Sequence, residues 1–127
     1  MIFIFGGKHQ GKTTYALTQY GPKLNICDLA TEKNLDNMYE ADLIKNIQDG
    51  VSSLLQQEIS PTNYFAANID RLKHKILLGT EIGCGIVPLE QTKRIWRDET
   101  GRVYQILVSH AKVVERVWAG IAIRLKG

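Results

Sequence analysis

The chain has 127 residues, which suits a single domain with one hydrophobic core. Its apolar fraction of 44% and charged fraction of 23% are ordinary for a soluble globular protein, and its net charge of +3 is too small to predict nucleic-acid binding by itself. The two cysteines, Cys27 and Cys84, lie far apart without a CxxC pattern, so we expect no metal site from them and a reducing, cytoplasmic location. No apolar stretch is long enough to predict a membrane span.

The first predicted element is a strand over residues 2–5, because "IFIF" is a continuous apolar run of the kind found in parallel sheets. A short helix follows over residues 12–20 and ends where Gly21 and Pro22 stop it. Residues 23–29, "KLNICDL", form a second strand candidate.

The middle of the chain is predicted to be helical. Over residues 31–58 apolar side chains recur at spacings of three and four, although Gly50 interrupts the pattern. Another helix is predicted to open at Ser60-Pro61-Thr62, with Thr62 or Ser60 as its N-cap, and to continue to about Lys73.

The second half alternates again between strands and helices. A strand is predicted over residues 75–80, a glycine-spaced loop follows over 81–88, and the longest helix covers 89–112. The last fifteen residues predict one bent strand or two short ones. This order predicts one α/β domain over residues 1–127, with a mostly parallel sheet and right-handed crossovers.

The stretch "GGKHQGKT", residues 6–13, fits the phosphate-binding pattern G-x-x-x-x-G-K-[ST]. Gly6 and Gly11 allow backbone angles and close approaches that a Cβ would block, and the helix N-terminus adds partial positive charge. Lys12 is predicted to neutralise the β- and γ-phosphates of a nucleoside triphosphate, and Thr13 to offer its hydroxyl to Mg²⁺. A flexible surface turn, the alternative, leaves Lys12 and Thr13 unexplained. The nucleotide-binding residues predicted in this loop are Gly6, Gly7, Lys8, His9, Gln10, Gly11, Lys12 and Thr13.

Two acidic residues follow predicted strands and are candidates for the metal side of the phosphates. Glu81 comes directly after the strand over 75–80, and Asp28 follows "LNIC". We expect Glu81 to hold Mg²⁺ together with Thr13 and to act with Lys12 in catalysis, and Asp28 to lie near the nucleotide. The alternative for each acid is a solvated strand end or a helix cap. The loop and its context predict a P-loop NTPase-type three-layer domain.

Nucleophilic catalysis and nucleic-acid binding have little support in the sequence. His9, His74 and His110 lie in no Ser/His/Asp or Cys/His context. The basic residues of the predicted long helix alternate with acids instead of forming a stripe with aromatic residues, which predicts a solvated face.

The second half resembles a known family. "TEIGCGIVP" followed by "RIWRDETGRVYQ" is similar to the adenosylcobinamide kinase / adenosylcobinamide-phosphate guanylyltransferase family, and "FGGKHQGKT" looks like that family's opening loop. The similar positions are Glu81, Gly83, Gly85, Ile86, Val87, Pro88, Trp96, Arg97, Asp98, Gly101 and Arg102. The resemblance implies ATP or GTP with Mg²⁺ as substrate, a corrinoid (cobinamide) as acceptor, a role in cobalamin biosynthesis, and a homo-oligomer.

The middle of the chain departs from the family pattern. Full members are longer and carry, after the second strand, a histidine that takes GMP as a phosphoramidate, whereas residues 29–60 contain no histidine. The family's apolar strand with an acid ahead of its central helix is not evident either, because "ADLIKN" is a poor match. Tyr104 stands where the family tends to have asparagine.

Two functions from different classes follow. The first is a kinase that transfers the γ-phosphoryl group of ATP or GTP to a hydroxyl of cobinamide, with guanylyl transfer doubtful because its histidine is not seen. The alternative is a catalytically reduced nucleotide-binding module with a regulatory or assembly role.

Overall fold

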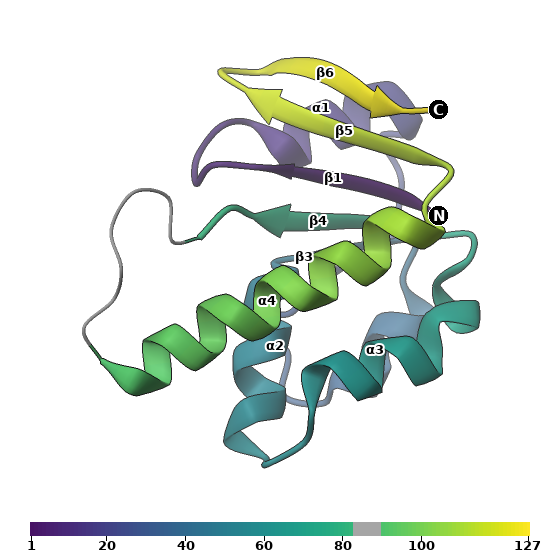
Figure 1. Cartoon of the computed structure of the whole chain (residues 1–127). Coiled ribbons are helices and arrows are strands. Elements are labelled where there is room, and N and C mark those ends of the chain that lie inside the picture. Colours follow the sequence, from purple (N-terminus) through teal and green to yellow (C-terminus); the bar gives the residue numbers. More distant parts are fainter. Residues whose placement is uncertain (83–89) are drawn as a thin grey trace.

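Six strands form one sheet in the computed structural model, which describes residues 1–82 and 90–127 (Figure 1). The spatial order is β2-β3-β4-β1-β5-β6, and every neighbouring pair is parallel except the β5–β6 hairpin. The bounds are β1 Ile2–Gly6, β2 Ile26–Asp28, β3 Leu43–Lys45, β4 Ile76–Thr80, β5 Val113–Trp118 and β6 Ile121–Lys126. The predicted α/β fold with a mostly parallel sheet is confirmed.

Helices cover both faces of this sheet and make the predicted three layers (Figure 1). Helix α1 lies on one face, and α2, α3 and α4 lie on the other. The bounds are α1 Lys12–Tyr20, α2 Ile47–Gln56, α3 Pro61–Asn68 and α4 Gln91–His110, with short 3₁₀ helices η1 Leu35–Glu40 and η2 Ile69–Leu72. Of the two predicted caps, Ser60 is the one that caps α3, because its hydroxyl accepts a hydrogen bond from the amide of Asn63.

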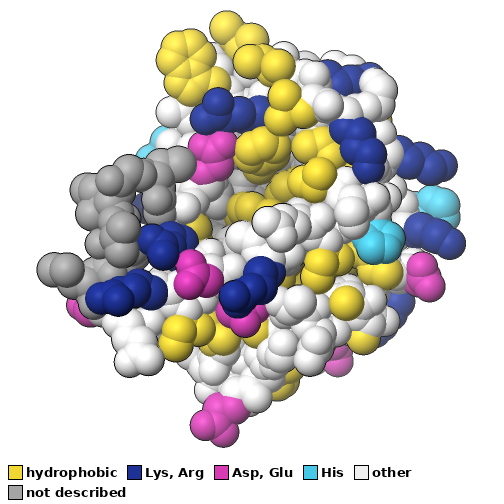
Figure 2. Space-filling view, viewed as in Figure 1, with side chains coloured by type: hydrophobic (Ala, Val, Ile, Leu, Met, Phe, Trp, Pro, Cys, Tyr) yellow, Lys and Arg dark blue, Asp and Glu magenta, His cyan; other side chains and the backbone are white. Residues whose placement is uncertain are grey.

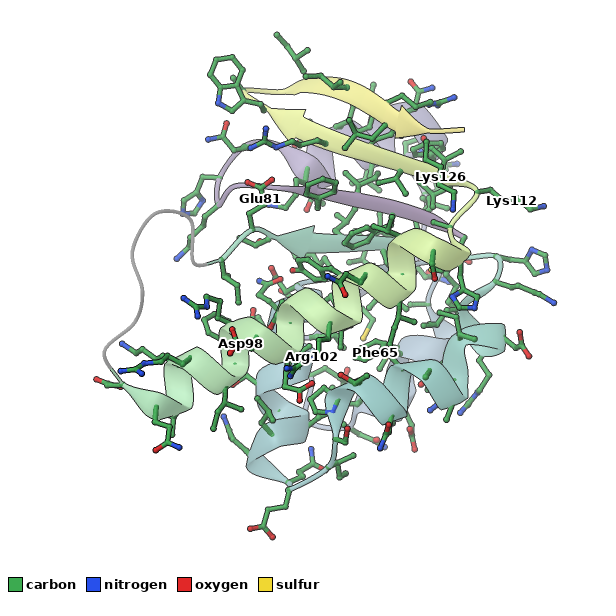
Figure 3. All side chains as sticks on the ribbon, viewed as in Figure 1. Phe65, Glu81, Asp98, Arg102, Lys112 and Lys126 are labelled. Atoms are coloured by element: carbon green, nitrogen blue, oxygen red, sulfur yellow. The ribbon has the colours of Figure 1, made fainter. Side chains whose placement is uncertain are left out.

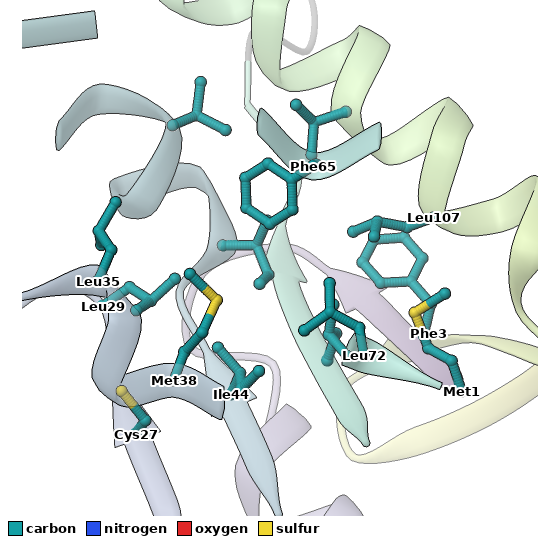
Figure 4. Close-up of a cluster of buried hydrophobic side chains, with 14 of the residues drawn as sticks. Met1, Phe3, Cys27, Leu29, Leu35, Met38, Ile44, Phe65, Leu72 and Leu107 are labelled. Atoms are coloured by element: carbon teal, nitrogen blue, oxygen red, sulfur yellow. The ribbon is translucent and has the colours of Figure 1, made fainter. Parts of the chain in front are cut away.

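The core consists of two apolar clusters, one on each face of the sheet. Neighbouring residues of β1 divide between them: Phe3 belongs to the cluster that includes residues of α2, α3 and α4, while Ile4 belongs to the cluster that includes Ala16 of α1. Figure 4 shows the larger cluster, in which Phe3, Phe65 and Leu107 meet between the sheet and the helices. Because the central strands are buried on both faces, their sequences read as continuous apolar runs.

The prediction for residues 31–58 was wrong in part, because this segment contains a strand. Leu43, Ile44 and Lys45 form β3, which pairs with β2 on one side and β4 on the other. Leu43 and Ile44 are both fully buried, on opposite faces of the sheet, so the pair has no polar–apolar alternation. The apolar residues of this short strand lie between two helical segments and also fit the apolar spacing of a helix. The sequence "ADLIKN" is therefore a poor match to a strand pattern.

The carboxyl-terminal hairpin leaves apolar side chains exposed at one edge of the sheet. Trp118 and Ile121 are each 62% exposed, and Ile123 and Leu125 are also exposed. Figure 2 shows apolar side chains gathered over this part of the molecule. The homo-oligomer implied by the family resemblance stays a prediction.

None of the described helices has the length and hydropathy that a bilayer crossing requires.

Two glycines give a matched stability test of this packing. A Cβ on Gly79 in β4 would lie 2.6 Å from the hydroxyl oxygen of Tyr104, whereas a Cβ on Gly101 in α4 would meet nothing within 4 Å. We expect Gly79→Ala to lower the free energy of unfolding by about 1–3 kcal/mol through overpacking. Gly101→Ala should raise it by about 0.5–1 kcal/mol, because alanine loses less entropy in a helix. Urea denaturation of both variants measures these changes, and equal effects would contradict the packing described for Gly79.

Candidate functional site

A polar cavity opens at the end of the sheet where β1, β3 and β4 finish, on the face covered by α1. Its volume is about 320 Å³. The lining residues are Lys8, His9, Gln10, Gly11, Lys12, Thr13, Thr14, Lys45, Asn46, Leu78 and Thr80. The cavity therefore lies where parallel α/β sheets bind ligands, and it includes six of the eight loop residues predicted to contact a nucleotide.

The loop between β1 and α1 turns through left-handed backbone conformations at two residues. Gly11 has φ 89°, which glycine tolerates without strain, and His9 has φ 61°. The N-cap residue of α1 is Gly11, which has no side chain to cap the helix, and the first turn of α1 holds no acidic residue. Because Lys12, Thr13 and Thr14 at this N-terminus line the cavity, the positive end of the helix dipole faces the cavity.

Lys12 reaches back across this loop. Its Nζ donates hydrogen bonds to the carbonyl oxygens of Gly7 (2.8 Å) and Gly6 (3.3 Å). Partial burial lowers the pKa of Lys12, the Glu81 carboxylate opposes this shift, and the charge of Lys45 adds to it. The ammonium is therefore held over the loop by two neutral carbonyl oxygens. An anion in the cavity would stabilise the charge of Lys12 more than these carbonyls do.

The loop is fixed to the β5–β6 hairpin by Gln10 and by a close approach at Gly6. The side-chain oxygen of Gln10 accepts a hydrogen bond from the amide of Ala119 (2.6 Å), and its backbone oxygen accepts one from Gly120 (2.9 Å). A Cβ on Gly6 would lie 2.3 Å from the carbonyl oxygen of Val117. Gly6 and Gly7 do not line the described cavity, but their carbonyls hold Lys12.

The two acids predicted to face a metal are both bound to other groups. Arg116 of β5 makes two hydrogen bonds to Glu81, at 2.8 Å and 3.2 Å, one to each carboxylate oxygen. Figure 3 shows Glu81 at the end of the sheet where β1 and β4 finish. Asp28 accepts hydrogen bonds from the amide of Ala30 (2.9 Å) and from Asn46 Nδ2 (2.7 Å). Among the described residues that line the cavity, neither Glu81 nor Asp28 is present.

These contacts do not fit the Mg²⁺ site that we expected from Thr13 and Glu81. Thr13 lines the cavity, but no described lining residue is a carboxylate, and magnesium sites in proteins usually include at least one. Within residues 1–82 and 90–127, no group of three His, Cys, Asp or Glu side chains could hold a metal ion. The arrangement is one of cations and neutral hydrogen-bonding groups, which suits an anion.

A buried polar network that the sequence analysis missed supports the far side of the cavity. Buried Gln48 accepts a hydrogen bond at Oε1 from the amide of Thr80 (3.0 Å) and donates from Nε2 to Asn46 Oδ1 (3.2 Å). The hydroxyl of Tyr104 donates to the carbonyl oxygen of Thr80 (2.7 Å), and burial raises the pKa of Tyr104. Hydrogen bonds with Gln48 and Tyr104 thus fix Thr80, and a hydrogen bond from Gln48 fixes Asn46; Thr80 and Asn46 both line the cavity. The place of Asn46 could have been predicted only if β3 had been recognised, because Asn46 directly follows that strand.

None of the described residues behind the family resemblance in the second half of the chain lines the cavity, although the Glu81 carboxylate is close enough to Lys12 to affect its pKa. Trp96 donates from Nε1 to the carbonyl oxygen of Gln48 (2.7 Å). Asp98 and Arg102 lie on the exposed surface of α4 (Figure 3). The loop positions Gly83, Gly85, Ile86, Val87 and Pro88 lie outside the described residues.

Comparison with known proteins gives one family. The model of the cobinamide kinase / cobinamide phosphate guanyltransferase family matches residues 43–125, which is more than half of the chain. The chain belongs to this family. The matched range begins at β3 and does not include the loop at residues 6–13, so the evidence for that loop is its pattern and geometry.

The other two comparisons add little to this assignment. The flagellar accessory protein FlaH from Methanocaldococcus jannaschii is similar in structure, with 14% sequence identity and a TM-score of 0.43, over 98% of this chain and 77% of that chain. We infer nothing from a likeness of this degree. A search of curated proteins found no match.

The lowered pKa of Lys12 predicts how anion binding depends on pH. An anion in the cavity raises the pKa of Lys12. Above the pKa that Lys12 has without a ligand, the anion-bound protein therefore holds more protons than the free protein, and the affinity for the anion falls as pH rises. Titration calorimetry with ATP from about pH 8 upward measures this, because its terminal phosphate is already ionised there. We expect the affinity to begin falling before ordinary lysines titrate, and Lys12→Ala to lack this early fall. A flat profile for the unmodified protein would contradict the placement of Lys12.

Proposed function

We propose that the cavity binds the polyphosphate of ATP or GTP and that the protein transfers the γ-phosphoryl group to the hydroxyl of the aminopropanol arm of cobinamide. The observation that carries this proposal is the cavity at the N-terminus of α1, with Lys12 held over it. Membership of the cobinamide kinase / cobinamide phosphate guanyltransferase family supports the reaction type, since both activities consume nucleoside triphosphates.

In this proposal the chain positions the triphosphate and neutralises its charge. Backbone amides of residues 11–14 and the α1 dipole bind the β-phosphate, and the ammonium of Lys12 leaves the carbonyls of Gly6 and Gly7 to bind the β- and γ-phosphates. The acceptor hydroxyl forms a bond to the γ-phosphorus while the bond from that phosphorus to the bridging oxygen breaks. The hydroxyl proton passes to the carboxylate of Glu81, the acid expected to act in catalysis, and ADP or GDP is released.

The second family activity, guanylyl transfer, is not part of this proposal. Residues 29–60 contain no histidine, so the histidine that the family resemblance implies as the carrier of GMP is missing from that stretch. His74 and His110 are exposed, and His110 lies at the last turn of α4. His9 lines the cavity on the phosphate loop, where a contact with phosphate is the simpler role.

A nucleotide-binding module without transfer activity is the alternative, and one observation favours it. Arg116 binds both carboxylate oxygens of Glu81, the acid proposed for catalysis and for the metal. An enzyme that used Glu81 would have to do so with one lone pair of each carboxylate oxygen already occupied by Arg116, whereas a binding module has no such requirement.

Substitution of Lys12 tests nucleotide binding. We expect Lys12→Ala to lower the affinity for ATP and GTP by about tenfold or more, the size of one charge-assisted contact in a water-poor site. Its melting temperature should change little, because Lys12 is only half-buried and the Gly6 carbonyl also accepts a hydrogen bond from the amide of Glu81 (2.8 Å). Lys93→Ala, an exposed lysine on α4, is the control. Unchanged affinity in Lys12→Ala would overturn the proposed cradle.

The product formed from cobinamide distinguishes the two functions. We expect mass spectrometry of a reaction with cobinamide and ATP or GTP to show cobinamide with one added phosphoryl group, and none with an added GMP. Glu81→Gln should slow product formation more than it weakens nucleotide binding. Nucleotide binding without any phosphorylated cobinamide would support the binding module instead.

A further inference from the structure

Lys45 brings a second cation to the phosphate cavity from the opposite side to the loop. It is the last residue of β3, and it lies on the same face of the sheet as Leu43, the face that α1 covers. It lines the cavity together with Lys12, and its charge is close enough to lower the pKa of Lys12. The cavity thus has a cation on the loop side and another at the end of a central strand.

The contacts of Lys45 leave it able to bind an anion. Its Nζ lies 4.0 Å from an Asp28 oxygen, a distance too long for a good hydrogen bond, and both side chains are 31% exposed. The other oxygen of Asp28 accepts hydrogen bonds from Asn46 and from the amide of Ala30. Such a loose, partly exposed pair contributes little, so moving Lys45 onto a ligand has a small cost.

The side chains that line the cavity carry a net positive charge, which favours an anion there. Its described lining holds Lys8, Lys12 and Lys45 and no carboxylate, and Glu81 is bound by Arg116. A carboxylate at the carboxyl end of β3 could have held a divalent ion beside Thr13. The residue at that position is Lys45, whose side chain carries an ammonium group instead. A second lysine does electrostatically what the metal ion would do, because it offsets the negative charge of the terminal phosphates.

We propose that Lys45 is a phosphate-binding residue that, together with Lys12, allows this cavity to bind a triphosphate without a divalent metal ion. The inference rests on the proposed function, since it assigns the groups that hold the nucleotide's terminal phosphates. The ligand class is a nucleoside triphosphate or another polyphosphate, recognised by its charge.

The test compares ATP binding in excess EDTA and in excess Mg²⁺, by titration calorimetry at one ionic strength. The unmodified protein should bind ATP in EDTA within a few-fold of its affinity with Mg²⁺. Lys45→Gln should lose about tenfold or more in EDTA and recover part of this loss with Mg²⁺. Lys45→Glu should lose more in EDTA, because it places a like charge against the phosphates. Inorganic tripolyphosphate should show the same order, because the contact is with the phosphates.

Controls separate this inference from the function on which it rests. Lys23→Gln, at an exposed lysine between α1 and β2, should bind as the unmodified protein does, and thermal melts of all variants show that they are folded. Full ATP affinity of Lys45→Gln in EDTA, or loss of binding by the unmodified protein when Mg²⁺ is removed, would overturn the role of Lys45 and leave the nucleotide cavity standing. No ATP binding by the unmodified protein under either condition would overturn the proposed function itself.

Discussion

The hydrogen bonds from the Lys12 ammonium to the carbonyls of Gly6 and Gly7 are the contacts on which the site depends. They hold a charged side chain across a loop whose backbone turns at His9 and Gly11 to bring the N-terminus of α1 to the cavity. Gln10 also fixes this loop, because it accepts hydrogen bonds from the amides of Ala119 and Gly120 in the β5–β6 hairpin. The loop is therefore organised before any ligand arrives, and binding does not have to order it.

Charge balance then decides what this cavity can hold. A helix N-terminus and three lysines favour anions, and the nearby carboxylates of Glu81 and Asp28 are each held by other groups. The network of Gln48, Asn46 and Tyr104 fixes the opposite wall through buried hydrogen bonds, which are costly to leave unmade. Family membership gives the reaction type, and the lining gives the chemistry that the site can support.

Local patterns in the sequence were enough to predict much of this arrangement. The apolar run of β1, the glycines of the loop and the stop at Gly21 predicted α1 with its observed bounds and β1 to within one residue at the loop. β3 could not be predicted, because three residues buried on both faces carry no period and their flanks read as helix. Missing β3 also hid Lys45 and Asn46, since only the sheet order places its end beside β4 and the loop.

The ion pair of Glu81 with Arg116 shows a second limit of local reasoning. The prediction that Glu81 faces a metal came from its place at the end of a strand. That place is correct, since Glu81 directly follows β4, but its partner Arg116 lies 35 residues away on β5. Pairing of β1 with both β4 and β5 brings these two strand ends within reach of each other, and no local pattern contains that information.

The most direct test of the account is a nuclear magnetic resonance titration of ¹⁵N-labelled protein with ATP in EDTA. The account predicts that the largest backbone amide shifts fall on residues 11–14 at the start of α1, with a second set at Lys45 and Asn46. Shifts confined to other parts of the chain, with the amides at the start of α1 unmoved, would contradict it.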